Sequence, residues 1–143
     1  MPVTYVPVTV PDAAAYTIKA DNSGLIHYMP DLAADCTITP PTPRAGLWFE
    51  FVYSGAAADA HDWIFDTGTN TRYYKGGVVY NLTSAGDTED EVVSVMSDGN
   101  SNSKFTVLTP EGGTRVRLEC ADGATWNVSG VVISADPPTF GDQ

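Results

Sequence analysis

The stretch GLWFEFVYS at residues 46–54 decides the fold of this chain. It is rich in aromatic and β-branched residues, which favour strands. Successive side chains of a strand point to opposite faces. The wholly apolar face is predicted to lie in the core, and it comprises Leu47, Phe49, Phe51 and Tyr53. The other face carries Trp48, Glu50 and Val52, and a glutamate between two apolar residues indicates that this face is only partly covered.

The same strand signals recur along the chain, separated by turns rich in Gly, Pro, Asp and Asn. They predict about ten short strands, in the segments 16–20, 24–29, 35–39, 46–54, 63–68, two pieces of 72–82 around Gly76-Gly77, 92–96, 104–109, 114–120 and 125–134. PEGG (110–113) and ADG (121–123) are typical of hairpin turns, and the tail 135–143 is expected at the surface. Within 114–120, Val116 and Leu118 are predicted to face inward.

These segments favour an all-β fold, namely an antiparallel sandwich, a jelly roll or a small barrel. No segment has the pattern of a crossover helix, which disfavours parallel α/β folds. Residues 12–143 are expected to form one β domain, because 143 residues suit a single domain with its own core.

Residues 1–11 stand apart from this domain, because Pro2, Pro7 and Pro11 interrupt an otherwise strand-like stretch. We expect an extended N-terminal arm that adds to the sheet edge of a neighbouring subunit. A disordered tail is the alternative. The residues expected to carry the docking are Val3, Tyr5, Val8 and Val10.

The charge balance restricts the possible partners. The 7 basic and 18 acidic residues give a net charge of −11. Nucleic-acid binding needs clustered Lys and Arg, so it is not expected. No secretory signal pattern opens the chain, and no apolar run approaches the ~18 residues of a membrane span. We therefore expect synthesis in the cytoplasm and no membrane association.

Residues that carry chemistry are sparse, and we expect neither catalysis nor a metal or other cofactor. The only histidines are His27, in a predicted strand, and His61, beside Asp62. A cupin-type metal site needs more histidines, and no GxSxG or phosphate-binding glycine motif is present. Two acidic or turn segments, 87–91 and 98–103, do not have EF-hand spacing. Cys36 and Cys120 lack a CxxC neighbour and are predicted to be buried free thiols, with a disulfide as the alternative.

Aromatic side chains are the remaining candidates for ligand binding. They could stack on sugar rings, or they could fill the core or a subunit interface, which is the commoner use. The residues in question are Tyr28, Trp48, Trp63, Tyr73, Tyr74, Tyr80 and Trp126.

Several phrases of the chain together suggest a family. They are ADNSGLIHY (20–28), DCTITPP (35–41), AGLWFEFVYSGAAADAHDWIFDTG (45–68), SDGN (97–100) and ECADGATWNVSGV (119–131). Over roughly residues 16–134 the chain resembles the head decoration, or capsid cement, proteins of tailed bacteriophages. That resemblance implies a non-enzymatic virion protein on the capsid surface. It also implies a homo-oligomer, often a trimer, that binds and stabilises the lattice of the major capsid protein.

Two other functions stay open at this point. One is a carbohydrate-binding module or the receptor-binding tip of a phage tail fibre, in which Trp and Tyr side chains stack on sugars. The other is a jelly-roll enzyme with a metal that uses His27 and His61.

Overall fold

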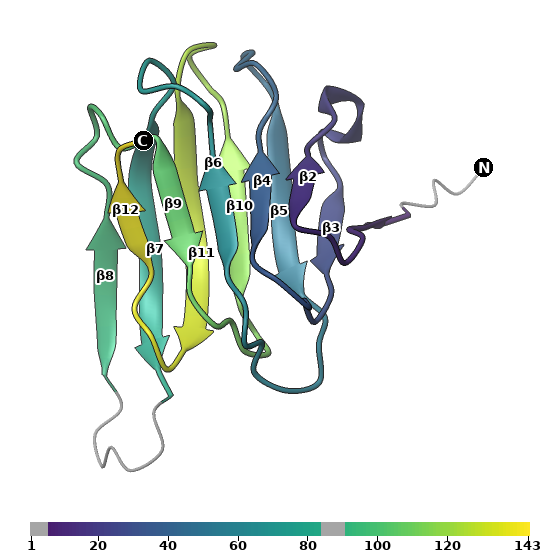
Figure 1. The fold of residues 1–143 in the computed structure, drawn as a ribbon. Coiled ribbons are helices and arrows are strands. Elements are labelled where there is room, and N and C mark those ends of the chain that lie inside the picture. The colour runs from purple at the N-terminus through teal and green to yellow at the C-terminus, as the bar shows by residue number, and fades with distance from the viewer. Residues whose placement is uncertain (1–5, 84–90) are drawn as a thin grey trace.

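The computed structural model describes residues 6–83 and 91–143, and it shows two β-sheets packed face to face as a sandwich (Figure 1). The seven-stranded sheet has the order β1 (Val8–Thr9), β3 (Ile26–Met29), β5 (Trp48–Tyr53), β10 (Arg115–Glu119), β11 (Trp126–Ser134), β7 (Tyr74–Leu82) and β8 (Val92–Met96). The five-stranded sheet has the order β12 (Thr139–Gly141), β9 (Lys104–Val107), β6 (Trp63–Asp66), β4 (Cys36–Thr39) and β2 (Ala15–Thr17). A single 3-10 turn, η1 (Ala20–Asn22), precedes β3. The predicted all-β sandwich is confirmed.

The orientation of the strands differs from the antiparallel arrangement expected. From β1 to β7 the chain alternates between the two sheets, and from β3 to β6 each strand lies beside the one two places earlier. Four parallel pairs result from this alternation: β1–β3, β3–β5, β2–β4 and β4–β6. A fifth parallel pair joins β7 to β11. Parallel neighbours need a crossover between them. In the four pairs formed by β1 to β6, a strand of the opposite sheet provides that crossover, so no helix is required.

The turn predictions are confirmed in part. ADG (121–123) does connect an antiparallel pair, β10 and β11. PEGG (110–113) does not close a hairpin, because it connects β9 of the five-stranded sheet to β10 of the seven-stranded sheet. Gly76 and Gly77 lie inside the continuous strand β7 rather than between two pieces. The tail contributes β12, whose Phe140 ring stacks on Phe105 with centroids 4.6 Å apart.

The described part of the N-terminal segment belongs to this chain's own sheet. Val8 and Thr9 pair in parallel with His27 and Tyr28. Val10 donates its N–H to the carbonyl of Tyr28 at 3.0 Å and is 1% exposed. The structure therefore uses Val8 and Val10 internally, and deletion of residues 1–11 would remove core as well as arm. Val3 and Tyr5 lie outside the described residues.

Aromatic rings fill the space between the sheets. Phe51 of β5 meets Phe65 of β6 edge to face, with centroids 5.1 Å apart. Phe65 in turn stacks on Phe105 of β9 at 5.9 Å. Residues of the predicted inner face of 46–54 are at most 5% exposed, which confirms that prediction. Trp48, Glu50 and Val52 are half-buried, as the pattern of that strand indicated.

Close approach of two strands makes one glycine necessary in the seven-stranded sheet. Gly130 of β11 has φ +134°, and it pairs with Val116 of β10. A Cβ at this position would lie 2.0 Å from the carbonyl oxygen of Arg115. That oxygen belongs to the backbone, so it cannot move aside without distorting β10.

We expect Gly130→Ala to lower the free energy of unfolding by about 2 kcal/mol or more, because it adds both backbone strain and a clash with β10. Gly141→Ala is the matched control, since nothing lies within 4 Å of a Cβ there. Urea unfolding of the two variants measures the difference. Equal stabilities would contradict this account of the β10–β11 contact.

Candidate functional site

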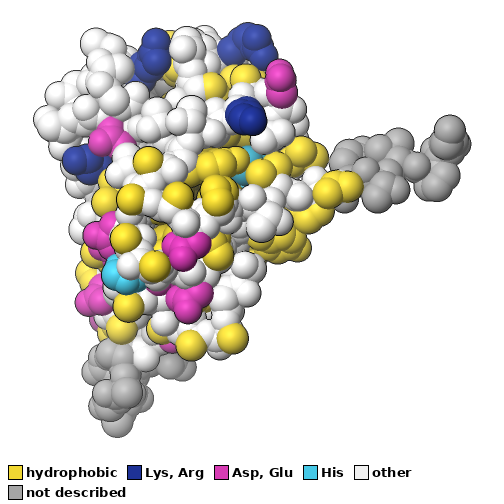
Figure 2. All heavy atoms as spheres, turned by 45° about the vertical axis from the view of Figure 1, so that its right-hand side comes forward, with side chains coloured by type: hydrophobic (Ala, Val, Ile, Leu, Met, Phe, Trp, Pro, Cys, Tyr) yellow, Lys and Arg dark blue, Asp and Glu magenta, His cyan; other side chains and the backbone are white. Residues whose placement is uncertain are grey.

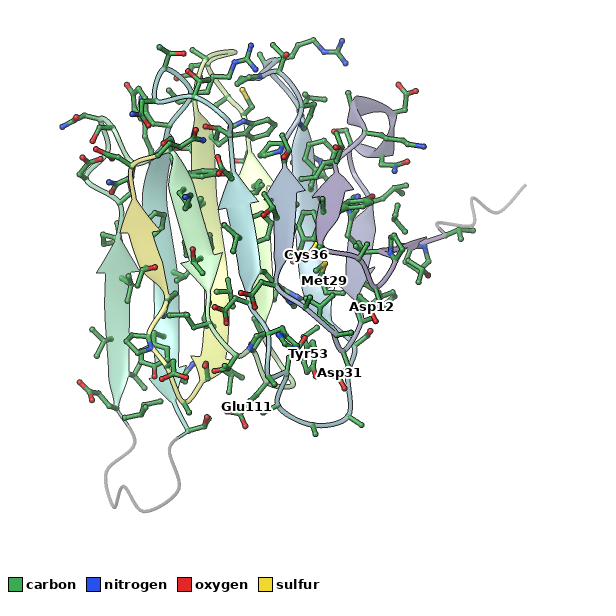
Figure 3. The ribbon with its side chains drawn as sticks, viewed as in Figure 1. Asp12, Met29, Asp31, Cys36, Tyr53 and Glu111 are labelled. Carbon is green, nitrogen blue, oxygen red and sulfur yellow. The ribbon has the colours of Figure 1, made fainter. Side chains whose placement is uncertain are left out.

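Acidic loops gather at one end of the sandwich. The loops that follow β1, β3, β5, β9 and β11 all leave the sheets at this end, at the bottom of Figures 1 and 3. Every Asp, Glu, Lys or Arg in loops 10–14, 30–35, 54–62, 108–114 and 135–138 is acidic: Asp12, Asp31, Asp35, Asp59, Asp62, Glu111 and Asp136. Figure 3 labels three of them, together with Tyr53.

Several of these carboxylates hold the loops together. Asp59 is 1% exposed, and its two oxygens accept the backbone N–H groups of Leu32 and His61, each at 3.0 Å. Asp62 accepts the N–H of Thr109 at 3.0 Å. Burial is the main cause that raises the pKa of Asp59 and of Asp62. These carboxylates therefore accept backbone hydrogen bonds that connect neighbouring loops.

Neither histidine forms a catalytic arrangement in the part of the chain that the structure describes. His61 is partly exposed, and its Nδ1 lies 3.5 Å from Oδ1 of Asp35. His27 is fully buried, and no hydroxyl or thiol hydrogen-bonds to either ring among the described residues. No three His, Cys, Asp or Glu side chains come together as a metal site within residues 6–83 and 91–143.

His27 instead forms part of the aromatic core. Its ring stacks on Phe51 with centroids 4.7 Å apart and meets Phe49 and Tyr16 edge-on. Its Nδ1 lies 3.2 Å from the carbonyl oxygen of Leu25, and its Nε2 has no hydrogen-bond partner among residues 6–83 and 91–143. Burial lowers the pKa of His27 below its ordinary value. The ring is therefore held neutral in the folded protein.

This burial predicts a loss of stability in mild acid. As the pH falls below about 6.5, His27 takes up a proton in the unfolded chain before it does so in the folded chain. We expect the urea midpoint of the wild type to fall between pH ~7.5 and pH ~5.5, and that of His27→Gln to fall less. The raised pKa values of Asp59 and Asp62 act in the opposite sense, because those groups protonate more readily when folded. An unaltered pH dependence in His27→Gln would rule out this role.

Both cysteines are buried free thiols, which confirms that prediction. Cys36 lies in β4 of one sheet, and Cys120 directly follows β10 of the other. Burial, and next the charge of Asp12, raise the pKa of the Cys36 thiol. A thiol that stays protonated and buried is a poor nucleophile.

Most of the aromatic candidates for ligand binding are core residues. Trp63, Trp126 and Tyr74 are fully buried, and Tyr80 is 4% exposed. Only Tyr28, Trp48 and Tyr73 retain substantial accessible surface. Two of these, Tyr28 and Trp48, lie on the outer face of the seven-stranded sheet.

That outer face consists of cross-strand rows. The register of the sheet places one row across β3, β5, β10, β11 and β7, and its members are Tyr28, Val52, Arg115, Val131 and Val79. The next row contains Ile26, Glu50, Arg117 and Ser129. Side chains directly opposite each other on one face are in contact range. The face is therefore a continuous surface in which apolar side chains alternate with a few charges.

The charges on this face are paired with one another. Nε of Arg115 lies 3.3 Å from Oε1 of Glu50. Nη2 of Arg117 lies 3.0 Å from Oε2 of Glu119, and its guanidinium group sits 4.1 Å from the centre of the Trp48 ring. A planar guanidinium can stack on an aromatic ring in this way. Each cation is therefore matched locally, and the face carries no unpaired positive cluster that would attract a polyanion.

A groove of about 560 Å³ lies at the β3 side of the same face. Its lining is mainly apolar, and it consists of Val6, Pro7, Gly24, Leu25, Ile26, Tyr28, Trp48 and Glu50. The backbone of Trp48 is fixed there, because its N–H donates to Oγ of Ser23 at 3.1 Å and its carbonyl accepts from Gly24 at 2.8 Å. Figure 2 shows hydrophobic side chains gathered on the side where the described chain begins.

The two outer faces of the sandwich differ sharply. Every large hydrophobic residue that is exposed in the described chain lies on the seven-stranded sheet or just before it. Val93 points to the inner side of the edge strand β8, and the others are Val6, Tyr28, Val79, Val92, Met96 and Val131. The outward side chains of the five-stranded sheet are mostly small or polar, with half-buried Ile64 as their large aliphatic member: Ala15, Thr17, Thr37, Thr39, Ile64, Asp66, Lys104, Thr106 and Thr139. The seven-stranded sheet therefore provides the candidate interaction surface, and the threonine-rich sheet does not.

Comparison with known protein families, with curated proteins and with solved structures finds no match. No helix in the described part of the chain is long and apolar enough to cross a membrane.

Proposed function

We propose that this chain is a non-enzymatic virion structural protein that decorates and stabilises a tailed-phage capsid by binding the lattice of the major capsid protein. The observation that carries the proposal is the confinement of exposed large hydrophobic residues to one sheet. A surface of this kind, with its charges already paired, suits a broad contact with another protein. The choice of a capsid as that protein follows from the sequence resemblance.

Other features of the molecule support a binding role rather than catalysis. The buried carboxylates bond to loop backbone, and the buried histidine packs among aromatic rings. The net charge of −11 favours solubility of the free protein before it is assembled. A homo-oligomer on the capsid surface is part of the proposal, with the outer face of the seven-stranded sheet turned toward the lattice.

The first test is the abundance of the chain in purified virions. Quantitative mass spectrometry would compare it with the major capsid protein. A ratio near parity supports a place on the head lattice. A ratio far below parity would move the chain to a vertex or a fibre, and its absence from virions would overturn the proposal.

We expect the double variant Val79→Lys/Val131→Lys to weaken binding to undecorated capsids by about tenfold or more, because it puts two charges at the centre of the docking face. These two residues oppose each other across β7 and β11. Ala15→Lys/Thr139→Lys adds the same charge to exposed positions of the five-stranded sheet and should bind like the wild type. Sedimentation with capsids measures both. Equal loss of binding by the two variants would show that charge alone, rather than this face, matters.

A carbohydrate-binding module or fibre tip is the second candidate, because Trp48 and Tyr28 line the same groove beside Glu50. Trp63 and Trp126 are fully buried, so a fluorescence shift on addition of host polysaccharide would report on Trp48. Such a shift, saturable and lost in Trp48→Phe, would favour sugar binding over capsid binding.

A further inference from the structure

We propose that two copies of this chain associate through β8, edge to edge and antiparallel, so that the two seven-stranded sheets become one continuous sheet. The inference rests on the backbone and side chains of Val92–Met96 and not on the proposed capsid role. It differs from the trimer that the sequence resemblance implies.

β8 is an open edge that the second sheet does not cover. It pairs with β7 and with no other strand of the described chain. Val93 lies opposite Tyr80 and so points to the core side of the sheet, yet Val93 is 40% exposed and Tyr80 only 4%. The five-stranded sheet thus stops short of β8, which lies at the outermost position on the left of Figure 1. On the outer face, Val92 and Met96 are 62% and 61% exposed.

The backbone of β8 presents its free groups in a definite order. Leu82 donates its N–H to the carbonyl of Glu91 at 3.0 Å, and Ser97 donates to Gly76 at 2.9 Å. In an antiparallel ladder, residues bonded to the partner strand alternate with residues whose N–H and C=O point away from it. Residues 91, 93, 95 and 97 therefore face β7. Val92, Ser94 and Met96 offer their backbone groups to the open edge.

A second copy of the same strand satisfies these groups without a shift in register. Antiparallel pairing about a two-fold axis at Ser94 places Ser94 opposite its own copy and Val92 opposite Met96. Each of these pairs brings two outward-facing residues together, so each can exchange both backbone hydrogen bonds. A two-fold contact of this type uses the same surface on both subunits and closes at a dimer.

The side chains are complementary to their own copies in this register. Val93 meets Val95 on the core side, while Val92 meets Met96 on the outer side. No charged residue lies within Val92–Met96, and the flanking Glu91 falls opposite Ser97 of the second copy. The two Glu91 side chains lie at opposite ends of the pair and do not face each other. For a chain with net charge −11, the uncharged segment Val92–Met96 is a favourable place for self-association.

Ser94→Pro is the decisive variant. It removes the N–H at the centre of the proposed contact, whereas that N–H makes no bond to β7, and proline is tolerated on edge strands where the N–H faces outward. In sedimentation velocity we expect a dimer for the wild type. We expect a rise of about tenfold or more in the dissociation constant for Ser94→Pro. Ser94→Ala keeps the N–H and is the matched control, which should remain a dimer.

Cysteine cross-linking tests the register independently of proline. Hydrogen-bonded antiparallel partners have Cα atoms about 5.5 Å apart, which is within disulfide range. Ser94→Cys should therefore form a disulfide dimer on mild oxidation. Val92→Cys alone should not, because Val92 opposes Met96 rather than itself. The native thiols Cys36 and Cys120 are buried and do not compete.

The outcomes separate this inference from the proposed function. A wild type that stays monomeric, an oligomer that Ser94→Pro leaves unchanged, or equal cross-linking by the two cysteine variants would overturn self-pairing. If circular dichroism shows that Ser94→Pro does not fold, the comparison of Ser94→Cys with Val92→Cys decides. A monomer whose capsid binding is lost in Ser94→Pro would assign the edge to a capsid strand, which overturns self-pairing and leaves the capsid role standing. A β8 dimer that is absent from virions would support self-pairing and overturn the capsid role.

Discussion

The structure depends on the alternation of consecutive strands between two sheets. Because the chain crosses the sandwich at each step from β1 to β7, one stretch of chain supplies strands to both sheets in turn. Aromatic contacts stabilise the packed sheets: Phe51 meets Phe65 across the sandwich, and Phe65 stacks on Phe105. The burial of such rings is the main favourable term in a core of this size. The two sheets should therefore unfold together rather than separately.

The same alternation explains the arrangement of the polar groups. Every crossing from one sheet to the other places a loop at an end of the sandwich, where backbone N–H groups need partners. Aspartates meet that need at the acidic end, since Asp59 joins loops 30–35 and 54–62 and Asp62 reaches the loop after β9. Their oxygens are engaged in these bonds, and their raised pKa values reflect burial rather than a proton-transfer partner. An abundance of Asp in this chain is thus mainly a property of its crossings.

Side-chain alternation predicted strand positions well and strand partners poorly. The inner faces of β5 and β10 follow directly from the pattern, because apolar residues alternate with charged ones in β10 and one face of β5 is wholly apolar. That pattern is the same for parallel and antiparallel neighbours, so it could not reveal the crossings between sheets. PEGG was predicted to close a hairpin because turn residues do not reveal that the strands on either side, β9 and β10, belong to different sheets. Val10 was expected in a docking arm because prolines flank it, but contacts distant in sequence place it in the core. The residues that share the outer face of the seven-stranded sheet could not be identified without the strand order. One signal was available in the sequence: VVSVM is apolar at positions of both parities, which is unusual for a strand with one face in water.

Two opposing effects act on β8: its uncovered edge favours pairing, and the net charge of the molecule opposes it. Its uncovered apolar edge favours pairing with another strand, and natural proteins usually guard such edges with charge or proline. This chain has neither within Val92–Met96 and instead carries a net charge of −11 over the whole molecule. Repulsion between two such molecules acts over a Debye length of about 8–10 Å at ordinary salt, whereas edge pairing acts only at contact. The net charge therefore opposes association at any part of the surface, and the uncharged segment Val92–Met96 is where pairing is opposed least. Added salt, or a surface that concentrates the copies, shifts the balance toward the pair. A protein built in this way pairs through one edge, while the charge over the rest of its surface resists further aggregation.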